Sequence, residues 1–490
     1  MKHLLPTLLI VGFLASNSHS LATAQTHEHT ADPETSVTVE GEDDEPIQRV
    51  ARLNFVDGDV SFLRAGVTEW APAVQNLPLL SGDQIYVGDG ARAEIQLGNG
   101  NYVRLTERTS MTIADLTHTV AQLEVTEGIA LIRLERFGSA FTRFEIDTPN
   151  AALVLEQDGF YRVNVRGDEE SEVVVQRGSA EVATIDGNFK VKEGHRLLVD
   201  TSTDGRLEVA VDNSRDEWDV WSQDRDQTLD HTIAAASPDY VTNHERDFHC
   251  FFGASELAGY GSWTNVASYG YCWVPRVASG WAPYRAGQWL WSPRIGWTWL
   301  SHEPWGWAPY HYGRWAFLPN LGWSWVPGIH AGRHNYRHSY YQWRPGLVHF
   351  FNYRTPQGQF VGWYPLWPGE RWRRFDRHND RDDRDRRNAS RRNGSGWPGF
   401  NGRPNRNQSV SVLPVAGFSR PDQTPARPGT ITGDPSRWAG RDARPGLPEL
   451  SPTNSAAVPR WHANNGQGRQ RTVVIPPSEV ARRPVVTRNR

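Results

Sequence analysis

Between Val50 and Val211, short runs of residues alternate between apolar and polar side chains. Two examples are Arg52-Leu53-Asn54-Phe55-Val56 and Tyr161-Arg162-Val163-Asn164-Val165, and turns such as Gly98-Asn99-Gly100 separate the runs. Because alternate residues of a strand point to opposite faces, each run would present one apolar face. The pattern therefore predicts an all-β domain over residues 50–211, with the inward half of each run as its core.

The period changes over residues 212–236, which contain neither Gly nor Pro and place Trp218 and Trp221 three positions apart. This stretch predicts a linking helix capped by Asn213 or Ser214. The helix should end before Ser237-Pro238, because a residue that precedes proline disfavours helical geometry.

A repeat of 26 residues dominates the next segment, residues 237–370. Two series of Trp and two of Gly keep this spacing: Trp263, Trp289 and Trp315; Trp273, Trp299 and Trp325; Gly261, Gly287 and Gly313; Gly270, Gly296 and Gly322. Pairs separated by one residue, such as Trp289 and Trp291, share a face on a strand, and Ser292–Gly296 has the composition of a hairpin turn. We therefore expect β-hairpins that stack on one another, because one hairpin alone is marginally stable.

The aromatic residues of this segment supply either a core or a binding surface. Aliphatic residues are scarce there, which favours a core role for most of the Trp. Both faces of a small sheet cannot be core, so the candidates for solvent-facing contacts with sugar rings or a hydrophobic partner are Tyr284, Tyr310, Tyr312, Tyr340 and Tyr341.

Residues 1–24 have the pattern of a cleavable signal peptide. Lys2 and His3 precede the apolar run Leu4–Ala15, and Ala22-Thr23-Ala24 offers a cleavage site. The run is short for a membrane span, although an uncleaved anchor is the alternative. We expect a periplasmic or secreted protein without a transmembrane segment after cleavage. Residues 25–49, acidic and without periodicity, predict a disordered lead-in.

Composition points to a large segment without a packed core, since the hydrophobic content is 38% and the mean hydropathy is -0.60. Residues 371–490 hold 24 Arg, no Lys and 10 acidic residues, a balance of +14 against a net charge of -4 for the whole chain. We expect a disordered Arg/Pro/Gly-rich tail, either solvated or in contact with an anionic polymer. Interleaved acids, as in Arg381-Asp382-Asp383-Arg384, make nucleic acid an unlikely partner.

The two cysteines, Cys250 and Cys272, form either one disulfide in an oxidising compartment or two buried thiols. The sequence contains no nucleophile elbow, phosphate-binding loop, zinc-protease motif or ordered acid pair. We therefore expect no enzymatic activity, no cofactor and no metal site.

A series of motifs over residues 50–200 resembles the FecR-type periplasmic domain. It includes Gly58-Asp59-Val60, Leu80-Ser81-Gly82-Asp83-Gln84-Ile85 and Ile146-Asp147-Thr148-Pro149-Asn150-Ala151. The resemblance implies a β-rich domain of the kind found in regulators that relay an outer-membrane signal to a sigma factor. Those regulators carry an anti-sigma segment and a membrane helix before this domain, where this chain has a signal-peptide pattern.

The aromatic segment, with Tyr260-Gly261-Ser262-Trp263 and the run Trp305–Trp315, resembles a Trp/Tyr-rich domain of unknown function that follows FecR-like domains in secreted bacterial proteins. The leading hypothesis is a non-enzymatic, exported binding or scaffold protein that contacts an envelope protein or polysaccharide. The alternative is a periplasmic sensor or regulatory component of a FecR-like signalling pathway.

Overall fold

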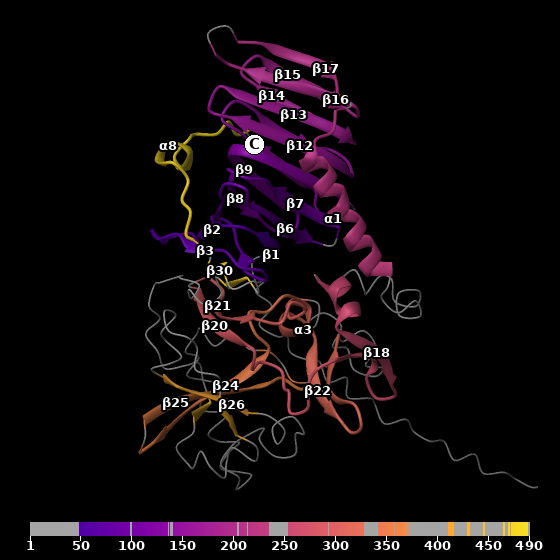
Figure 1. Cartoon of the computed structure of the whole chain (residues 1–490), viewed down its shortest axis with the longest axis vertical. Coiled ribbons are helices and arrows are strands. Elements are labelled where there is room, and N and C mark those ends of the chain that lie inside the picture. Colours follow the sequence, from indigo (N-terminus) through magenta and orange to yellow (C-terminus); the bar gives the residue numbers. More distant parts are fainter. Residues whose placement is uncertain are drawn as a thin grey trace, which may run out of the picture. The chain divides into compact units, whose positions relative to one another are not determined.

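A computed structural model of the chain shows a mainly β fold, as predicted (Figure 1). It describes residues 49–488 except for these positions: 99, 136, 138–140, 203–204, 213, 235–252, 293, 328–341, 357, 369, 371, 373–409, 416–428, 432–443, 446–463, 466–468 and 471.

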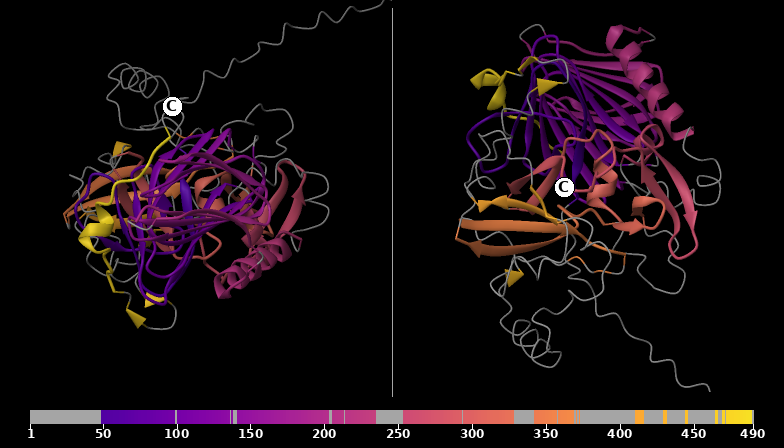
Figure 2. Two further views of the ribbon diagram at one scale, coloured as in Figure 1. Left: turned by 90° about the horizontal axis from the view of Figure 1, so that it is seen from above. Right: turned by 60° about the horizontal axis from the view of Figure 1, so that its bottom comes forward.

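Strands β1 to β17 form the all-β domain as two sheets that share one long strand. Sheet 1 has the order β4-β1-β6-β7-β9-β12-β13-β16-β17. Sheet 2 has the order β3-β2-β5-β8-β9-β10-β11-β14-β15, and Figure 2 shows both from two further directions. The first half of β9 pairs within sheet 2 and its second half within sheet 1.

The bounds of these strands are β1 Ala51–Asp57, β2 Val60–Leu63, β3 Ala71–Pro72, β4 Pro78–Leu79, β5 Gln84–Val87, β6 Arg92–Gly98, β7 Asn101–Leu105, β8 Ser110–Leu116, β9 Val120–Leu134, β10 Arg143–Asp147, β11 Ala152–Leu155, β12 Gly159–Arg166, β13 Glu170–Arg177, β14 Ser179–Thr184, β15 Gly187–Lys192, β16 His195–Asp200 and β17 Leu207–Val211.

The core of this domain follows the alternation of the sequence. Leu53, Val103 and Val163 of sheet 1 and Phe62 and Ile113 of sheet 2 belong to one buried apolar cluster. In such a pattern the polar residues of each strand face solvent. The outer face of sheet 1 differs, because many of its polar residues are buried as well.

Helix α1 (Glu217–Ala234) covers that outer face and occupies the segment predicted to be a linking helix. Its cap differs from the prediction of Asn213 or Ser214. Asp216 Oδ1 accepts hydrogen bonds from the backbone N–H of Trp218 and Asp219, at 2.9 and 3.1 Å, and Asp219 Oδ2 accepts one from the N–H of Asp216 at 3.1 Å. Asp216 and Asp219 thus satisfy three backbone N–H groups at the start of the helix. A cap at Asn213 or Ser214 would leave these groups without a hydrogen bond.

The 26-residue repeat is built as three β-hairpins, as predicted. In each, one Trp of the first series lies directly opposite one of the second: Trp263 opposite Trp273, Trp289 opposite Trp299, and Trp315 opposite Trp325. The strands are β18 Gly261–Val266, β19 Gly270–Pro275, β20 Gly287–Ser292, β21 Gly296–Ser301, β22 Arg314–Leu318 and β23 Gly322–Val326. Pairing of Trp273 with Trp325 joins the first and third hairpins into one four-stranded sheet.

The two glycine series have different physical causes. Gly270, Gly296 and Gly322 begin the second strands with φ of 73°, 79° and 75°, a left-handed conformation that favours glycine at the hairpin turn. Glycines of the other series lie under the indole of the opposite strand's Trp. A Cβ on Gly261, Gly287 or Gly313 would come within 2.4 to 2.6 Å of a ring atom of Trp273, Trp299 or Trp325.

Substitution of the two kinds of glycine should therefore differ in cost. A Cβ at Gly287 meets both the Trp299 ring and, at 2.5 Å, the carbonyl oxygen of Leu300, so we expect Gly287→Ala to destabilise by about 3 kcal/mol or more. At Gly296 nothing lies within 4 Å, and only the backbone conformation opposes a side chain. Gly296→Ala should cost about 1–2 kcal/mol. Thermal unfolding of both variants checks the order, and equal losses would contradict it.

The remaining elements of the aromatic segment are η1 Ala254–Gly259, α3 Trp307–His311, β24 Val348–Thr355 and β25 Gly358–Pro365. Trp305 and Trp307 do not form a strand pair, because Trp307 begins helix α3. Both still enter the large aromatic cluster that forms the core of this part of the chain.

The prediction of a disordered tail over residues 371–490 is wrong for several segments. β26 (Val410–Pro414) pairs with β25, and β27 (Gly429–Ile431) and β28 (Arg444–Pro445) extend the same sheet. β29 Asn464–Asn465 and β30 Arg469–Gln470 form a small hairpin, and α8 Ser478–Ala481 lies in an ordered stretch over residues 472–488. Averaged composition hides the short apolar runs that these segments bury, such as Val410 and Val412 of β26.

None of the helices in the described residues has the length and apolar character needed to cross a bilayer.

Candidate interaction surface

The outer face of sheet 1 carries a row of charged side chains beneath α1. Glu94 (β6) and Arg104 (β7) lie directly opposite each other on adjacent strands, and both side chains are 0% exposed. Arg133 (β9) and Arg162 (β12) continue the row, and their side chains are 8% and 11% exposed. Their strand neighbours Val103, Ile132 and Val163 point into the core, so alternation places these charges on the opposite face.

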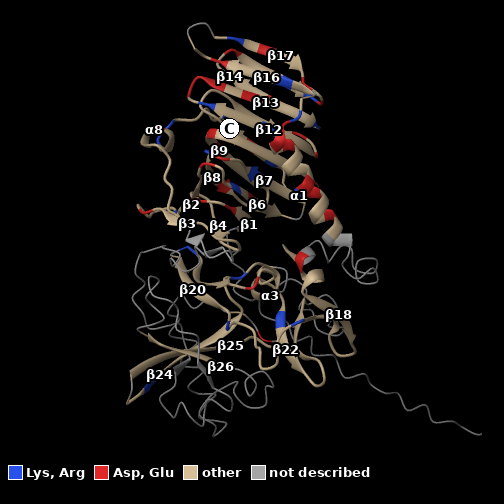
Figure 3. Cartoon of the chain, viewed as in Figure 1, with Lys and Arg blue, Asp and Glu red and all other residues tan. Residues whose placement is uncertain are grey.

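Helix α1 meets this row with an acidic stripe. Asp219, Ser222, Asp226 and Asp230 are spaced by three, four and four residues, which places them on one helical face. Figure 3 shows acidic residues along the length of α1. The spacing can be read from the sequence, but such a stripe is also typical of a solvent-exposed helix face. Its arginine partners are distant in the sequence, so the sequence alone does not reveal them.

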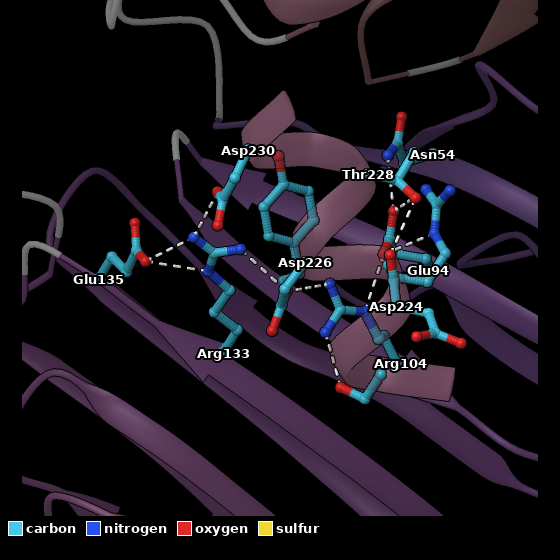
Figure 4. Close-up of polar contacts among 12 residues, drawn as sticks. Asn54, Glu94, Arg104, Arg133, Glu135, Asp224, Asp226, Thr228 and Asp230 are labelled. Carbon is cyan, nitrogen blue, oxygen red and sulfur yellow. Dashed lines mark hydrogen bonds and ion pairs between the residues drawn. The ribbon is translucent and has the colours of Figure 1, made fainter. Parts of the chain in front are cut away.

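Arg104 and Arg133 join the sheet to the middle of the helix (Figure 4). Arg104 donates from Nε to Glu94 Oε2 at 2.8 Å and from Nη2 to Asp226 Oδ1 at 2.6 Å. Arg133 donates from Nη1 to the same Asp226 oxygen at 2.9 Å and from Nη2 to Asp230 at 3.0 Å. From the helix side, Arg225 donates to Glu94 at 2.7 Å, so the sheet and the helix both contribute cations and anions.

A second contact fixes the start of the helix. Arg162 reaches Asp216 at 2.7 Å and Asp219 at 2.8 Å, and the side-chain amide of Gln176 donates to Asp219 at 2.6 Å. The helix is therefore held at two places along its length by charge-assisted hydrogen bonds, which are strongly directional and set its register on the sheet.

The neighbouring charges favour the ionised forms of Glu94 and Arg104. Burial disfavours the charged form of Glu94, but the guanidinium groups of Arg104 and Arg225 hold its pKa below the ordinary value. Burial likewise opposes the charge on Arg104, and Glu94 and Asp226 nevertheless raise its pKa. Removing one partner would therefore leave its neighbours as charges without compensation in a dry environment.

The region that follows α1 also contacts the β-domain. The fully buried guanidinium of Arg52 (β1) donates to both carboxylate oxygens of Glu256 (η1), at 3.0 and 2.7 Å. Val50 and Leu80 belong to the aromatic cluster rather than to the core of the β-domain. Apolar and ionic contacts thus connect the β-domain to the aromatic segment.

The Tyr residues predicted to face solvent do not do so where the structure describes them. Tyr284 and Tyr310 are 0% exposed and Tyr312 is 4% exposed, whereas Tyr340 and Tyr341 lie outside the described residues. Tyr284 has a left-handed φ of 60° that turns it into the aromatic cluster, and its hydroxyl donates to the Tyr310 carbonyl at 2.7 Å. The premise that the Tyr occupy the outer face of strands was wrong, since Tyr310 lies in α3.

The Trp of the repeat form a core, which confirms the structural interpretation of the motif. The fully buried examples include Trp273, Trp299, Trp315 and Trp325. Three of these indole N–H groups find backbone acceptors: Trp273 donates to the Leu257 carbonyl at 3.0 Å, Trp315 to the Pro309 carbonyl at 2.9 Å and Trp325 to the Tyr312 carbonyl at 2.8 Å.

The carboxyl group of Glu303 packs against this aromatic core. Glu303 accepts hydrogen bonds from Trp281 Nε1 at 2.7 Å, from the Tyr310 hydroxyl at 2.5 Å and from the Ser301 hydroxyl at 3.2 Å. Burial raises the pKa of Glu303 to about 7, although all three hydrogen bonds favour the ionised form.

We expect this group to make stability depend on pH. The pKa of Glu303 is raised above its ordinary value of 4.5. Its contribution to the free energy of unfolding is therefore complete below pH 4.5 and is lost as the pH rises through about 7. The loss should reach roughly 3 kcal/mol at most. Glu303→Gln resembles the protonated acid and should abolish this part of the dependence. Denaturant unfolding of both proteins at several pH values checks it, and parallel pH profiles would contradict it.

The structure describes only one of the two cysteines. Cys272 is buried in β19, and burial raises its pKa to about 12, whereas Cys250 lies outside the described residues. The disulfide therefore stays a prediction.

Comparison with known proteins identifies two families. Residues 83–181 match the FecR protein family, and residues 254–370 match a family of unknown function, DUF6600. No curated protein sequence matches the chain. Two crystal structures of a protein from Parabacteroides distasonis ATCC 8503, assigned as an anti-sigma factor, are 22% identical over 29% of this chain and 64% of theirs, with a TM-score of 0.25. The two family matches confirm both resemblances over these residues. The chain carries a FecR domain, a name used below for the whole β-domain of β1–β17, followed by a DUF6600 domain.

Proposed function

We propose that this chain is a non-enzymatic regulatory protein of the cell envelope that works through protein contacts. The FecR family match supports this role and favours the sensor hypothesis over a passive scaffold. Export by the signal-peptide pattern of residues 1–24 is part of the proposal, with the envelope as the place of action.

The observation that carries the proposal is the ionic attachment of α1 to the FecR domain. Buried ion pairs contribute little net stability, because desolvation offsets most of their attraction, but they specify geometry. Here they fix the helix that leads from the FecR domain toward η1, whose Glu256 binds Arg52. Binding of a partner to the FecR domain would therefore be linked, through the position of α1, to the DUF6600 domain.

The glycan version of the scaffold hypothesis loses the described Tyr candidates on which it rested. Stacking on sugars needs exposed aromatic faces, and Tyr284, Tyr310 and the paired Trp of the repeat lie in a core instead. Two protonatable groups of the interior also have structural partners: Glu303 is held by Trp281 and Tyr310, and Asp147 accepts a hydrogen bond from Gln122 at 2.7 Å. These contacts support a non-enzymatic role.

An edge strand offers the best position from which to identify the partner. β17 ends sheet 1 with Leu207, Val209 and Val211 exposed by 37%, 51% and 68%. Edge strands with apolar side chains are ready templates for contact with another chain.

A photo-crosslinking residue at Val209 of the full chain, in the producing cell, tests the proposal. We expect covalent capture of a regulatory membrane protein from Val209 and little capture from Val277, an apolar position of the DUF6600 domain that is 40% exposed. Equal labelling at both positions, or retention of polysaccharide without a protein adduct, would count against a regulatory role. Mass measurement of the envelope fraction should find a mature chain that begins at Gln25.

A further inference from the structure

Residues 472–488, here called the C-terminal arm, run across the strands of sheet 2 in the FecR domain. The backbone N–H of Thr472 donates to Asp59 Oδ1 at 3.0 Å, and that of Val474 donates to the Ser61 hydroxyl at 2.9 Å. At the other end, the N–H of Val486 donates to the Thr148 carbonyl at 2.8 Å. The arm thus passes from β2 to the turn after β10. Figure 1 shows its helix α8 in yellow beside the strands of the β-domain.

Two arginines of the arm bind carboxylates of the FecR domain. Arg483 donates to Glu127 Oε2 at 2.6 Å and to the Thr126 carbonyl at 2.5 Å, at the bend of β9. Arg488 forms a bidentate pair with Glu181 of β14, with both distances 2.9 Å. Bidentate pairing is directional and favours arginine over lysine at this position.

The arm also forms part of the wall of a half-open pocket of about 560 Å³. The FecR domain contributes Tyr86, Glu127 and Arg166 to its lining, and α1 contributes Trp218. Val480 and Arg483 of the arm form part of the remaining wall. Because Val480 is 5% exposed, the arm contributes apolar burial as well as charge.

These contacts are those of a peptide bound to a folded domain. The arm forms no strand with the sheet, and three backbone N–H groups reach acceptors on the domain near its two ends. Arg488 and Glu181 are 31% and 33% exposed, so this pair contributes little free energy in water. A covalently tethered segment remains bound despite weak intrinsic affinity, since tethering supplies an effective concentration on the order of 1 mM.

We propose that the C-terminal arm is an intramolecular peptide ligand of the FecR domain, and that its release uncovers a binding surface that includes this pocket. The surface would then accept an extended, arginine-bearing protein segment that resembles the arm. This inference does not depend on the proposed regulatory function, because it concerns only the contacts between the arm and the domain.

Binding of a fluorescent peptide with the sequence of residues 472–490 tests the proposal. We expect saturable binding to a chain truncated after Arg471, and apparent affinity at least about tenfold weaker for the intact chain, whose own arm competes. The peptide with Arg483→Glu should bind about tenfold or more weakly than the parent, because the Arg483 side chain is only 12% exposed where it meets Glu127. Arg488→Glu should weaken binding less, because its pair with Glu181 is more exposed. The control peptide Arg482→Glu carries the same charge change at an exposed position and should retain its affinity.

The full-length Arg483→Glu/Arg488→Glu variant guards against misfolding of the truncated chain. In this variant we expect faster backbone hydrogen exchange over residues 472–488 and an affinity for the parent peptide close to that of the truncated chain. Two results would overturn the proposal: no peptide binding to either protein, or an equal loss of affinity for the Arg482→Glu and Arg483→Glu peptides.

Discussion

Replacement of Arg104 by alanine should destabilise the FecR domain by about 3–5 kcal/mol, because it breaks a buried ion network from its centre. The Arg104 side chain is 0% exposed and binds Glu94, Asp226 and Ser222. Without it, Glu94 retains Arg225 and Asn54, and Asp226 retains Arg133. Each of the two acids nevertheless loses one of its two cations in a region closed to water. The cost comes mainly from the anions left behind.

Denaturant unfolding followed by circular dichroism checks this expectation. Arg206→Ala removes a cation that is 65% exposed and should change stability by less than about 0.5 kcal/mol. The double variant Arg104→Met/Glu94→Gln removes an anion together with the cation, and should be more stable than Arg104→Ala. If the double variant lost as much stability as the single one, unpaired charge would not be the cause.

The same network shows where prediction from the sequence stops. The alternation of Leu53, Val103 and Val163 was enough to predict the core of the FecR domain, because a strand's period determines which side chains share a face. The partners of Arg104 could not be predicted that way. Asp226 lies 122 residues away, and charged residues on alternate positions have the same pattern whether water or a helix covers them.

In the aromatic segment, too, the sequence predicted some features and not others. The spacing of 26 residues predicted the three hairpins, since a Trp pair and a turn glycine recur in each copy. It did not reveal that Tyr284 and Tyr310 are internal, because their burial depends on a left-handed residue and a short helix between hairpins. The C-terminal arm was missed because a tail rich in Arg, Pro and Gly has little core-forming sequence of its own, and its contacts are with a domain already folded.

Trp325→Ala should be the most damaging single change in the DUF6600 domain, with a loss of about 3–5 kcal/mol for an emptied core site. Trp325 is 0% exposed, pairs with both Trp273 and Trp315, and packs its ring on Gly313. Its indole N–H donates to the Tyr312 carbonyl, so truncation also leaves that acceptor without this bond. Trp325→Phe keeps most of the ring and should lose less.

Thermal unfolding measures these losses against Trp291→Ala, which removes a half-buried indole from the middle hairpin and should cost less. For a domain of this size, the larger loss corresponds to a fall in Tm of roughly 10 °C. The comparison separates two accounts of the repeat. If its Trp exist to build the core, the order of losses must follow burial and the sheet junction of Trp273 with Trp325. If Trp325→Ala unfolded at nearly the parent temperature, that junction would not hold the hairpins together, and the repeat would need another explanation.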